Sequence, residues 1–202
     1  MHRAVFLDRD GVINAAIYNP VEGKPDSPYS LEEFRVLPGT AKAIRMIRDM
    51  GFLAIVVSNQ PGVAKGKCRA ELLEAINDRL RTSLAEEGTR LDGVYYCRHH
   101  PQAVIPFLNV HCDCRKPRPG LLLAAAEEHD IDLSRSYMIG DQETDIGAGL
   151  AAGCRTVLVN GNCHLATGCG APQVRPHRFA DNLLAAAEAI ESLEGEGLWR
   201  SS

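Results

Sequence analysis

The chain has 202 residues, of which 45% are hydrophobic and 24% charged, so it can bury one substantial core and is not a disordered polymer. Its formal net charge of −4 argues against nucleic acid or an anionic membrane surface as a partner. The start of the chain lacks an apolar run of secretory length, and no run approaches a membrane span. We therefore expect a single domain over residues 1–202, a cytoplasmic monomer that acts on a small molecule.

Short apolar runs alternate with helical patterns along the chain. The expected strands are 4–7, 53–57, 94–97, 137–139 and 156–159, and the expected helices are 40–50, 70–87, 121–129, 144–152 and 182–193. This alternation predicts an α/β fold: a Rossmann-like parallel sheet with helices on both faces.

Two irregular segments interrupt the alternation, and neither is large enough for a cap domain. Residues 15–38 contain Pro20, Pro25, Pro28 and Pro38, which predicts a flap over a sheet edge in place of a regular helix. Residues 97–119 gather cysteines and histidines and end in a basic stretch. The end of the chain, residues 194–202, is expected to be a mobile tail.

Asp8 and Asp10 follow the first apolar run and are separated by one residue. Side chains alternate along a strand, so both carboxylates can face one ligand at its carboxyl end. Two neighbouring anions repel unless a cation lies between them, and Mg²⁺ suits both carboxylate and phosphate oxygens. Taken alone, an Asp-x-Asp motif more often marks a turn, here before Gly11.

Further polar groups follow two of the other apolar runs. Ligands of open α/β sheets bind beyond the carboxyl ends of the strands, so these groups are expected near the aspartate pair. They offer a hydroxyl, amide donors and additional carboxylates for a metal. The residues are Ser58, Asn59 and Gln60 after the second run, and Asp141 and Asp145 after the fourth.

Arg115 and Lys116 lie in a loop that Pro117 and Pro119 stiffen. Lys116 can hold a transferring phosphoryl group, and the guanidinium of Arg115 can bind a second phosphate with two hydrogen bonds. A solvated basic turn is the alternative interpretation of this stretch taken by itself.

Asp8-x-Asp10, Ser58, Lys116 and Gly140-Asp141-x-x-x-Asp145 occur in this order, which resembles the four motifs of the haloacid dehalogenase-like (HAD-like) phosphohydrolases. The resemblance implies that Asp8 is the nucleophile and Asp10 the acid and base. It also implies that Mg²⁺ is bound by Asp8, the backbone carbonyl of Asp10 and Asp141, while Asp145 orients Lys116 or lies in an outer shell. The residues expected to contact substrate are Arg9, Ser58, Asn59, Gln60, Arg115 and Lys116.

Seven cysteines are many for a cytosolic chain, and an odd number cannot all pair within it. Cys97, His99, Cys112 and Cys114 are enough for a closed tetrahedral site of three thiolates and one imidazole, which is typical of structural zinc. Their spacing differs from the common C-x-x-C pattern, so packed free thiols are the alternative.

Other histidines and cysteines are weaker ligand candidates. His100 and His111 lie near enough in sequence to compete for the zinc, although exposed loop histidines are the simpler interpretation. Cys163, His164 and Cys169 offer only three ligands in a glycine-rich loop, which favours ordinary side chains over a second metal site.

The sequence YCRHHP at 96–101, followed by CDCRKP at 112–117, resembles the zinc loop of the D-glycero-D-manno-heptose 1,7-bisphosphate 7-phosphatases. Related histidinol phosphatases carry a similar loop. The resemblance implies Mg²⁺-dependent removal of the 7-phosphate through an aspartyl-phosphate, with zinc in a structural role. Hydrolysis of histidinol phosphate is the first alternative, and a zinc-stabilised phosphosugar-binding protein without turnover is the second. The acidic net charge argues against a polynucleotide 3′-phosphatase.

Overall fold

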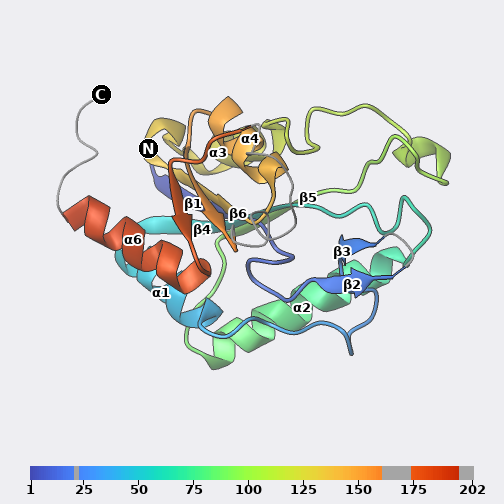
Figure 1. The fold of residues 1–202 in the computed structure, drawn as a ribbon, viewed down its shortest axis with the longest axis horizontal. Helices are drawn as coiled ribbons and strands as arrows, with labels where there is room; N and C mark the ends of the chain where they lie inside the picture. The colour runs from blue at the N-terminus through green and yellow to red at the C-terminus, as the bar shows by residue number, and fades with distance from the viewer. Residues whose placement is uncertain (21–22, 161–173, 196–202) are drawn as a thin grey trace.

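The computed structural model describes residues 1–20, 23–160 and 174–195 (Figure 1). Its central feature is a six-stranded parallel sheet in the order β5-β4-β1-β6-β7-β8. The strands are β1 Arg3–Leu7, β4 Phe52–Asn59, β5 Gly93–Cys97, β6 Tyr137–Gly140, β7 Arg155–Val159 and β8 Arg178–Ala180. The predicted parallel α/β fold is confirmed, with β8 as a strand that the sequence did not indicate.

The central strand β1 shows why the sheet is buried on both faces. Val5 and Leu7 pack into one hydrophobic cluster, whereas Ala4 and Phe6 pack into a second cluster on the opposite face. All four are fully buried. This division follows from the two-residue period of a strand, and it requires helices on both sides.

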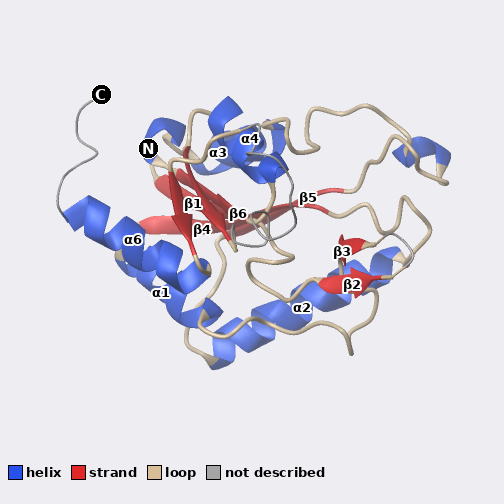
Figure 2. Cartoon of the chain, viewed as in Figure 1, coloured by secondary structure: helices blue, strands red, loops and turns tan. Residues whose placement is uncertain are grey.

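Among the described residues, five α-helices cover the two faces of the sheet, as the sequence predicted (Figure 2). Three of them pack with the first cluster: α1 Thr40–Asp49, α2 Ala70–Glu86 and α6 Leu183–Gly195. Two pack with the second: α3 Gly120–His129 and α4 Glu143–Ala151. Short 3₁₀ helices at Pro106–Leu108 and Leu133–Arg135 were not predicted.

The proline-rich insertion contains a small hairpin in place of the irregular flap that we expected. Its strands β2 Ile17–Asn19 and β3 Lys24–Asp26 pair antiparallel. Among the described residues this hairpin forms a sheet of its own and shares no ladder with the central sheet. In Figure 1 it lies on the side of the molecule to which the central strands point.

Two expectations about the rest of the chain need comment. Residue 194 does not begin a tail: Glu194 belongs to α6, where it accepts a hydrogen bond from Tyr137 Oη at 2.8 Å and pairs with Arg3. The remainder of that segment, 196–202, and Cys163, His164 and Cys169 lie outside the described residues. Within the described ranges, no helix has the length and apolar character to span a bilayer.

Candidate active site

The carboxyl ends of β1, β4 and β6 meet at one edge of the sheet, because β1 pairs with β4 on one side and β6 on the other. The backbone N–H of Asp8 continues this pairing by donating to Ile139 O at 2.9 Å. A cavity of about 280 Å³ opens at this edge. The predicted residues that line it are Asp8, Asp10, Ser58, Asn59, Arg115, Lys116, Asp141 and Asp145.

Lys116 is the buried cation of the site. Its Nζ lies 2.7 Å from Asp8 Oδ1 and 2.5 Å from Asp145 Oδ1, and it donates to Val57 O at 2.8 Å. Burial acts to lower the pKa of Lys116, but attraction to the two carboxylates outweighs it and raises this pKa above its usual value. Lys116 is therefore charged, and Asp145 is placed to orient it.

Asn59, which was expected to contact substrate, holds the loop that carries Lys116. Its Oδ1 accepts from the backbone N–H of Lys116 and its Nδ2 donates to the carbonyl of Lys116, both at 3.1 Å. The two bonds use both ends of the amide, although Asn59 still lines the cavity. Ser58, whose Oγ accepts from Gln60 Nε2 at 3.1 Å, faces the cavity beside it.

Arg9 and Gln60 do not line the cavity, contrary to the expectation that they bind substrate. Arg9 is fully buried and Gln60 is 5% exposed. Both bond to Asp10: Gln60 Nε2 donates at 2.7 Å and Arg9 Nη2 at 3.0 Å, and Gln60 Oε1 accepts from Arg9 at 2.9 Å. Arg9 and Gln60 therefore hold the carboxylate of Asp10 from the protein interior.

Two further side chains contact Asp10. Asn14 Nδ2 donates to its Oδ1 at 2.9 Å, and Ser27 Oγ donates to its Oδ2 at 2.7 Å. Ser27 follows β3 in the inserted hairpin, and it lines the cavity together with Asp26 and Lys24. Sequence reasoning missed these residues, because nothing in a proline-rich insertion indicates which side chain turns inward.

The site concentrates negative charge. Asp8, Asp141 and Asp145 present oxygens within 4.8 Å of one another, and Lys116 is in direct contact with Asp8 and Asp145. Burial, with repulsion from Asp8 and Asp145, raises the pKa of Asp141 to about 8. Gly11, at φ +89°, allows this crowding: a Cβ there would lie 2.2 Å from Asp141 Oδ2.

Crowded carboxylates with too little positive charge fit a hard divalent cation such as Mg²⁺. The side-chain cluster contains Asp8 and Asp141, as expected, and Asp145 in addition. The carboxylate of Asp10 is not part of this cluster. Metal binding through the backbone carbonyl of Asp10 stays a prediction.

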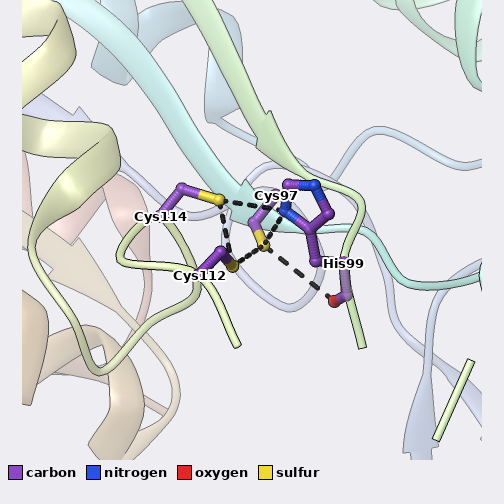
Figure 3. A group of neighbouring side chains, drawn as sticks. All are labelled: Cys97, His99, Cys112 and Cys114. Carbon is purple, nitrogen blue, oxygen red and sulfur yellow. Dashed lines mark hydrogen bonds between the residues drawn. The ribbon is translucent and has the colours of Figure 1, made fainter. Parts of the chain in front are cut away.

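A second group of candidate metal ligands lies at the end of β5 (Figure 3). Cys97 Sγ is 3.6 Å from Cys112 Sγ, Cys112 Sγ is 3.2 Å from Cys114 Sγ, and His99 Nδ1 is 3.3 Å from Cys114 Sγ. A tetrahedral zinc with thiolate ligands would separate the sulfurs by about 3.8 Å. These four side chains therefore have the donor chemistry and the spacing to hold zinc, while His100 and His111 stand outside the group.

The cysteine and histidine cluster is joined to Arg115 and Lys116, two of the cations that line the cavity. Cys114 precedes Arg115 and Lys116 in the chain, and Arg115 Nη1 donates to the carbonyl of His99 at 3.3 Å. Since Arg115 and Lys116 both line the cavity, a metal held by the cluster would fix the wall from which they reach substrate.

Comparison with known proteins identifies the class to which this fold and site belong. A family model described as HAD-hydrolase-like matches residues 113–186. The D-glycero-beta-D-manno-heptose-1,7-bisphosphate 7-phosphatase of Escherichia coli K12 is 41% identical over 158 residues, which cover 77% of this chain and 78% of that protein. The enzyme of the same name from Pasteurella multocida is 38% identical over 162 residues, 79% and 82% of the two chains.

Solved structures agree with these sequence matches. The D,D-heptose 1,7-bisphosphate phosphatase from B. bronchiseptica, complexed with magnesium and phosphate, superposes with a TM-score of 0.76 at 31% identity, covering 94% of this chain and 98% of that one. A putative HAD-like phosphatase from Mesorhizobium loti gives 0.75 at 33% identity, with 94% and 87% covered. The chain thus belongs to the HAD-like phosphohydrolases and, within them, to the family of the heptose-bisphosphate phosphatases.

Proposed function

We propose that this phosphatase removes the 7-phosphate of D-glycero-D-manno-heptose 1,7-bisphosphate. The observation that carries the proposal is the contact between Asp8 and Lys116 in a cavity that Asp10, Asp141 and Ser58 also line. It joins a nucleophile, a proton carrier and a phosphate-binding cation in one place. The names of the relatives, which cover more than three quarters of the chain, support the choice of sugar.

Asp8 begins the reaction as the nucleophile. One of its carboxylate oxygens attacks phosphorus, and the bond between phosphorus and the sugar oxygen breaks, giving an aspartyl-phosphate. Lys116 holds Asp8 in place, with its ammonium group against Asp8 Oδ1. Ser58 and Lys116 are positioned to hold the phosphoryl oxygens, and Arg115 lies further along the same wall.

Asp10 moves the proton in both steps. It gives a proton to the sugar oxygen as that oxygen leaves, and it then accepts a proton from the water that attacks the aspartyl-phosphate. This second step releases inorganic phosphate and regenerates the carboxylate of Asp8. Arg9, Asn14 and Gln60 fix the direction in which Asp10 points.

Both metals belong to the proposal. Mg²⁺ held by Asp8, Asp141 and the backbone carbonyl of Asp10 would offset the repulsion between an anionic nucleophile and an anionic phosphate. Zinc held by Cys97, His99, Cys112 and Cys114 would be structural, because protein ligands fill all four positions. We also propose that the chain acts as a monomer, since one chain supplies every group that this chemistry uses. We propose the cytoplasm as its compartment.

Phosphate release from heptose 1,7-bisphosphate and from histidinol phosphate, each with and without Mg²⁺, tests the proposal. We expect kcat/KM to be higher for the heptose by at least about tenfold, activity to require Mg²⁺, and the Asp8→Asn variant to be inactive. A preference for histidinol phosphate would overturn the substrate. Binding of the heptose with no phosphate release would instead establish the binding protein without turnover.

A further inference from the structure

Ser27 is the point at which the inserted hairpin reaches the carboxylate of Asp10. Its Oγ donates to Asp10 Oδ2 at 2.7 Å, and Ser27 itself lines the cavity. We infer that Ser27 is a positioning residue for Asp10, and that the hairpin, anchored through Asp26, sets the direction from which Asp10 meets the leaving oxygen. The inference rests on the acid and base role proposed for Asp10.

The other side chains that bond to Asp10 approach it from the protein interior. Arg9 and Asn14 are fully buried and Gln60 is 5% exposed. Ser27 approaches from the hairpin, on the side where substrate must enter. The interior donors hold the carboxylate of Asp10 from one side only. The hydroxyl of Ser27 holds it from the other side and so restrains Oδ2 from rotating toward solvent.

Asp26 anchors the hairpin so that Ser27 stays in place. Its carboxylate accepts from Asn19 Nδ2 on β2 at 2.9 Å, from Tyr29 Oη at 2.5 Å and from Lys67 Nζ at 2.6 Å. Lys67 belongs to the segment between β4 and α2, so this ion pair fastens the hairpin to the body of the domain. The backbone N–H of Ser27 also donates to Asp26, at 2.9 Å.

Asp26 is ionised at neutral pH. Partial burial acts to raise the pKa of Asp26, but the hydrogen bonds from Lys67, Tyr29, Asn19 and the backbone of Ser27 hold it well below its usual value. Asp26 therefore remains an anion that attracts Lys67, and the hairpin stays fastened over the site. Neither Asp26 nor Ser27 follows a strand of the central sheet, which is why motif reasoning did not assign them.

A positioning role for Ser27 makes a prediction about leaving groups. A sugar alkoxide leaves slowly unless it is protonated, whereas 2,4-dinitrophenolate leaves readily without a proton. The value of kcat/KM reports the first chemical step, in which Asp10 acts as the acid. Misplacing Asp10 must therefore slow cleavage of a sugar phosphate far more than cleavage of 2,4-dinitrophenyl phosphate, whereas general damage to the site would slow both.

The experiment measures kcat/KM of the full chain with both substrates for Ser27→Ala, Ser27→Thr and Ser30→Ala. Ser30 is the matched control: it lies three residues away and its Oγ accepts from the backbone of Glu33. We expect Ser27→Ala to lose about 10- to 100-fold on the sugar phosphate and less than about threefold on the aryl phosphate. Ser27→Thr should restore the sugar phosphate rate, and Ser30→Ala should match the wild type.

An equal loss on both substrates, or no loss, would overturn the inference. The Asp10→Asn variant separates this failure from failure of the proposed mechanism. If Asp10→Asn shows the leaving-group dependence and Ser27→Ala does not, only the role of Ser27 is wrong. If Asp10→Asn is as active as the wild type, the acid and base assignment fails and the inference fails with it.

Discussion

Lys116 and Asp8 form a buried ion pair, with Nζ 2.7 Å from Oδ1, at the point where the central strand of the sheet ends. The same ammonium group contacts Asp145. The proposed nucleophile and the proposed phosphate-binding cation are thus joined through their side chains. The stability of the fold and the proposed chemistry of the site therefore depend on one contact.

Replacing Lys116 by methionine should damage both properties. Asp8 and Asp145 would remain buried without their cation, which typically lowers the free energy of unfolding by about 3–5 kcal/mol. Phosphate release should fall by at least about 10³-fold. Urea unfolding and a phosphate assay measure the two effects. Lys42→Met, at an exposed position of α1, is the control, and equal stability and activity in the two variants would contradict this account.

Gly11→Ala should reduce affinity for Mg²⁺, because its Cβ would lie 2.2 Å from Asp141 Oδ2. Gly51→Ala is a matched control: its φ of +82° is similar, and nothing lies within 4 Å of the added carbon. Both variants should lose roughly 1 kcal/mol of stability from the left-handed backbone. Only Gly11→Ala should need more Mg²⁺, about tenfold or above, for half-maximal activity. Equal Mg²⁺ dependence of the two variants would count against a metal beside Asp141.

The protein purified without chelator should contain one zinc per chain. Cys112→Ser should lose that zinc and lower the midpoint of thermal unfolding, because structural zinc contributes directly to folding free energy. It should also raise KM, since Arg115 bonds to the carbonyl of His99 in the cluster. Cys68→Ser, which removes a thiol outside the cluster, is the control. Metal analysis and calorimetry decide the matter, and a zinc-free preparation that is fully folded would refute the zinc site.

The anchoring of the hairpin should depend on pH in a defined direction. The folded-state pKa of Asp26 lies below its usual value, so its hydrogen bonds stabilise the fold above the unfolded pKa of about 3.9. That contribution is lost as pH falls below this value, because the unfolded chain binds the proton more tightly. Wild type should therefore be more stable than Asp26→Asn at pH 6, and the difference should shrink between about pH 4 and pH 3.

Unfolding by denaturant at several pH values measures this difference. Asp78→Asn serves as the control, because Asp78 pairs with Arg81 on the exposed surface of α2 and exposed pairs contribute little. A stability difference between wild type and Asp26→Asn that stays constant from pH 6 to pH 3 would show that the charge of Asp26 does not hold the hairpin.

Much of the fold could be predicted from the sequence because its signals are local and periodic. The alternation of Ala4, Val5, Phe6 and Leu7 between two cores follows from strand geometry, and it implies helices on both faces. The strand β8 gave no comparable signal, because its three residues are exposed or partly exposed and show no apolar run.

The site was predictable to the extent that parallel strands bring their carboxyl ends together. That rule placed Asp8, Ser58 and Asp141 at one cavity. It does not give the direction of each side chain, and Arg9 shows the consequence. Arg9 lies just beyond the end of β1, between two aspartates that line the cavity, and its side chain turns into the interior, where it holds Asp10.

The contact from Ser27 could not be predicted in this way. Ser27 and Asp10 are 17 positions apart in the sequence. Its position depends on the pairing of β2 with β3 and on the ion pair between Asp26 and Lys67. These are tertiary interactions between segments that no periodic pattern connects.

The separation of the hairpin from the central sheet has a consequence for how this molecule can change. Within the described residues β2 and β3 share no ladder with the six parallel strands. Asp8, in contrast, directly follows β1, which pairs with β4 on one side and with β6 on the other. The hairpin can therefore change length and composition without disturbing the pairing of the six parallel strands. The wall of the cavity that the hairpin forms can be remodelled for another substrate while Asp8, at the end of β1, keeps its position.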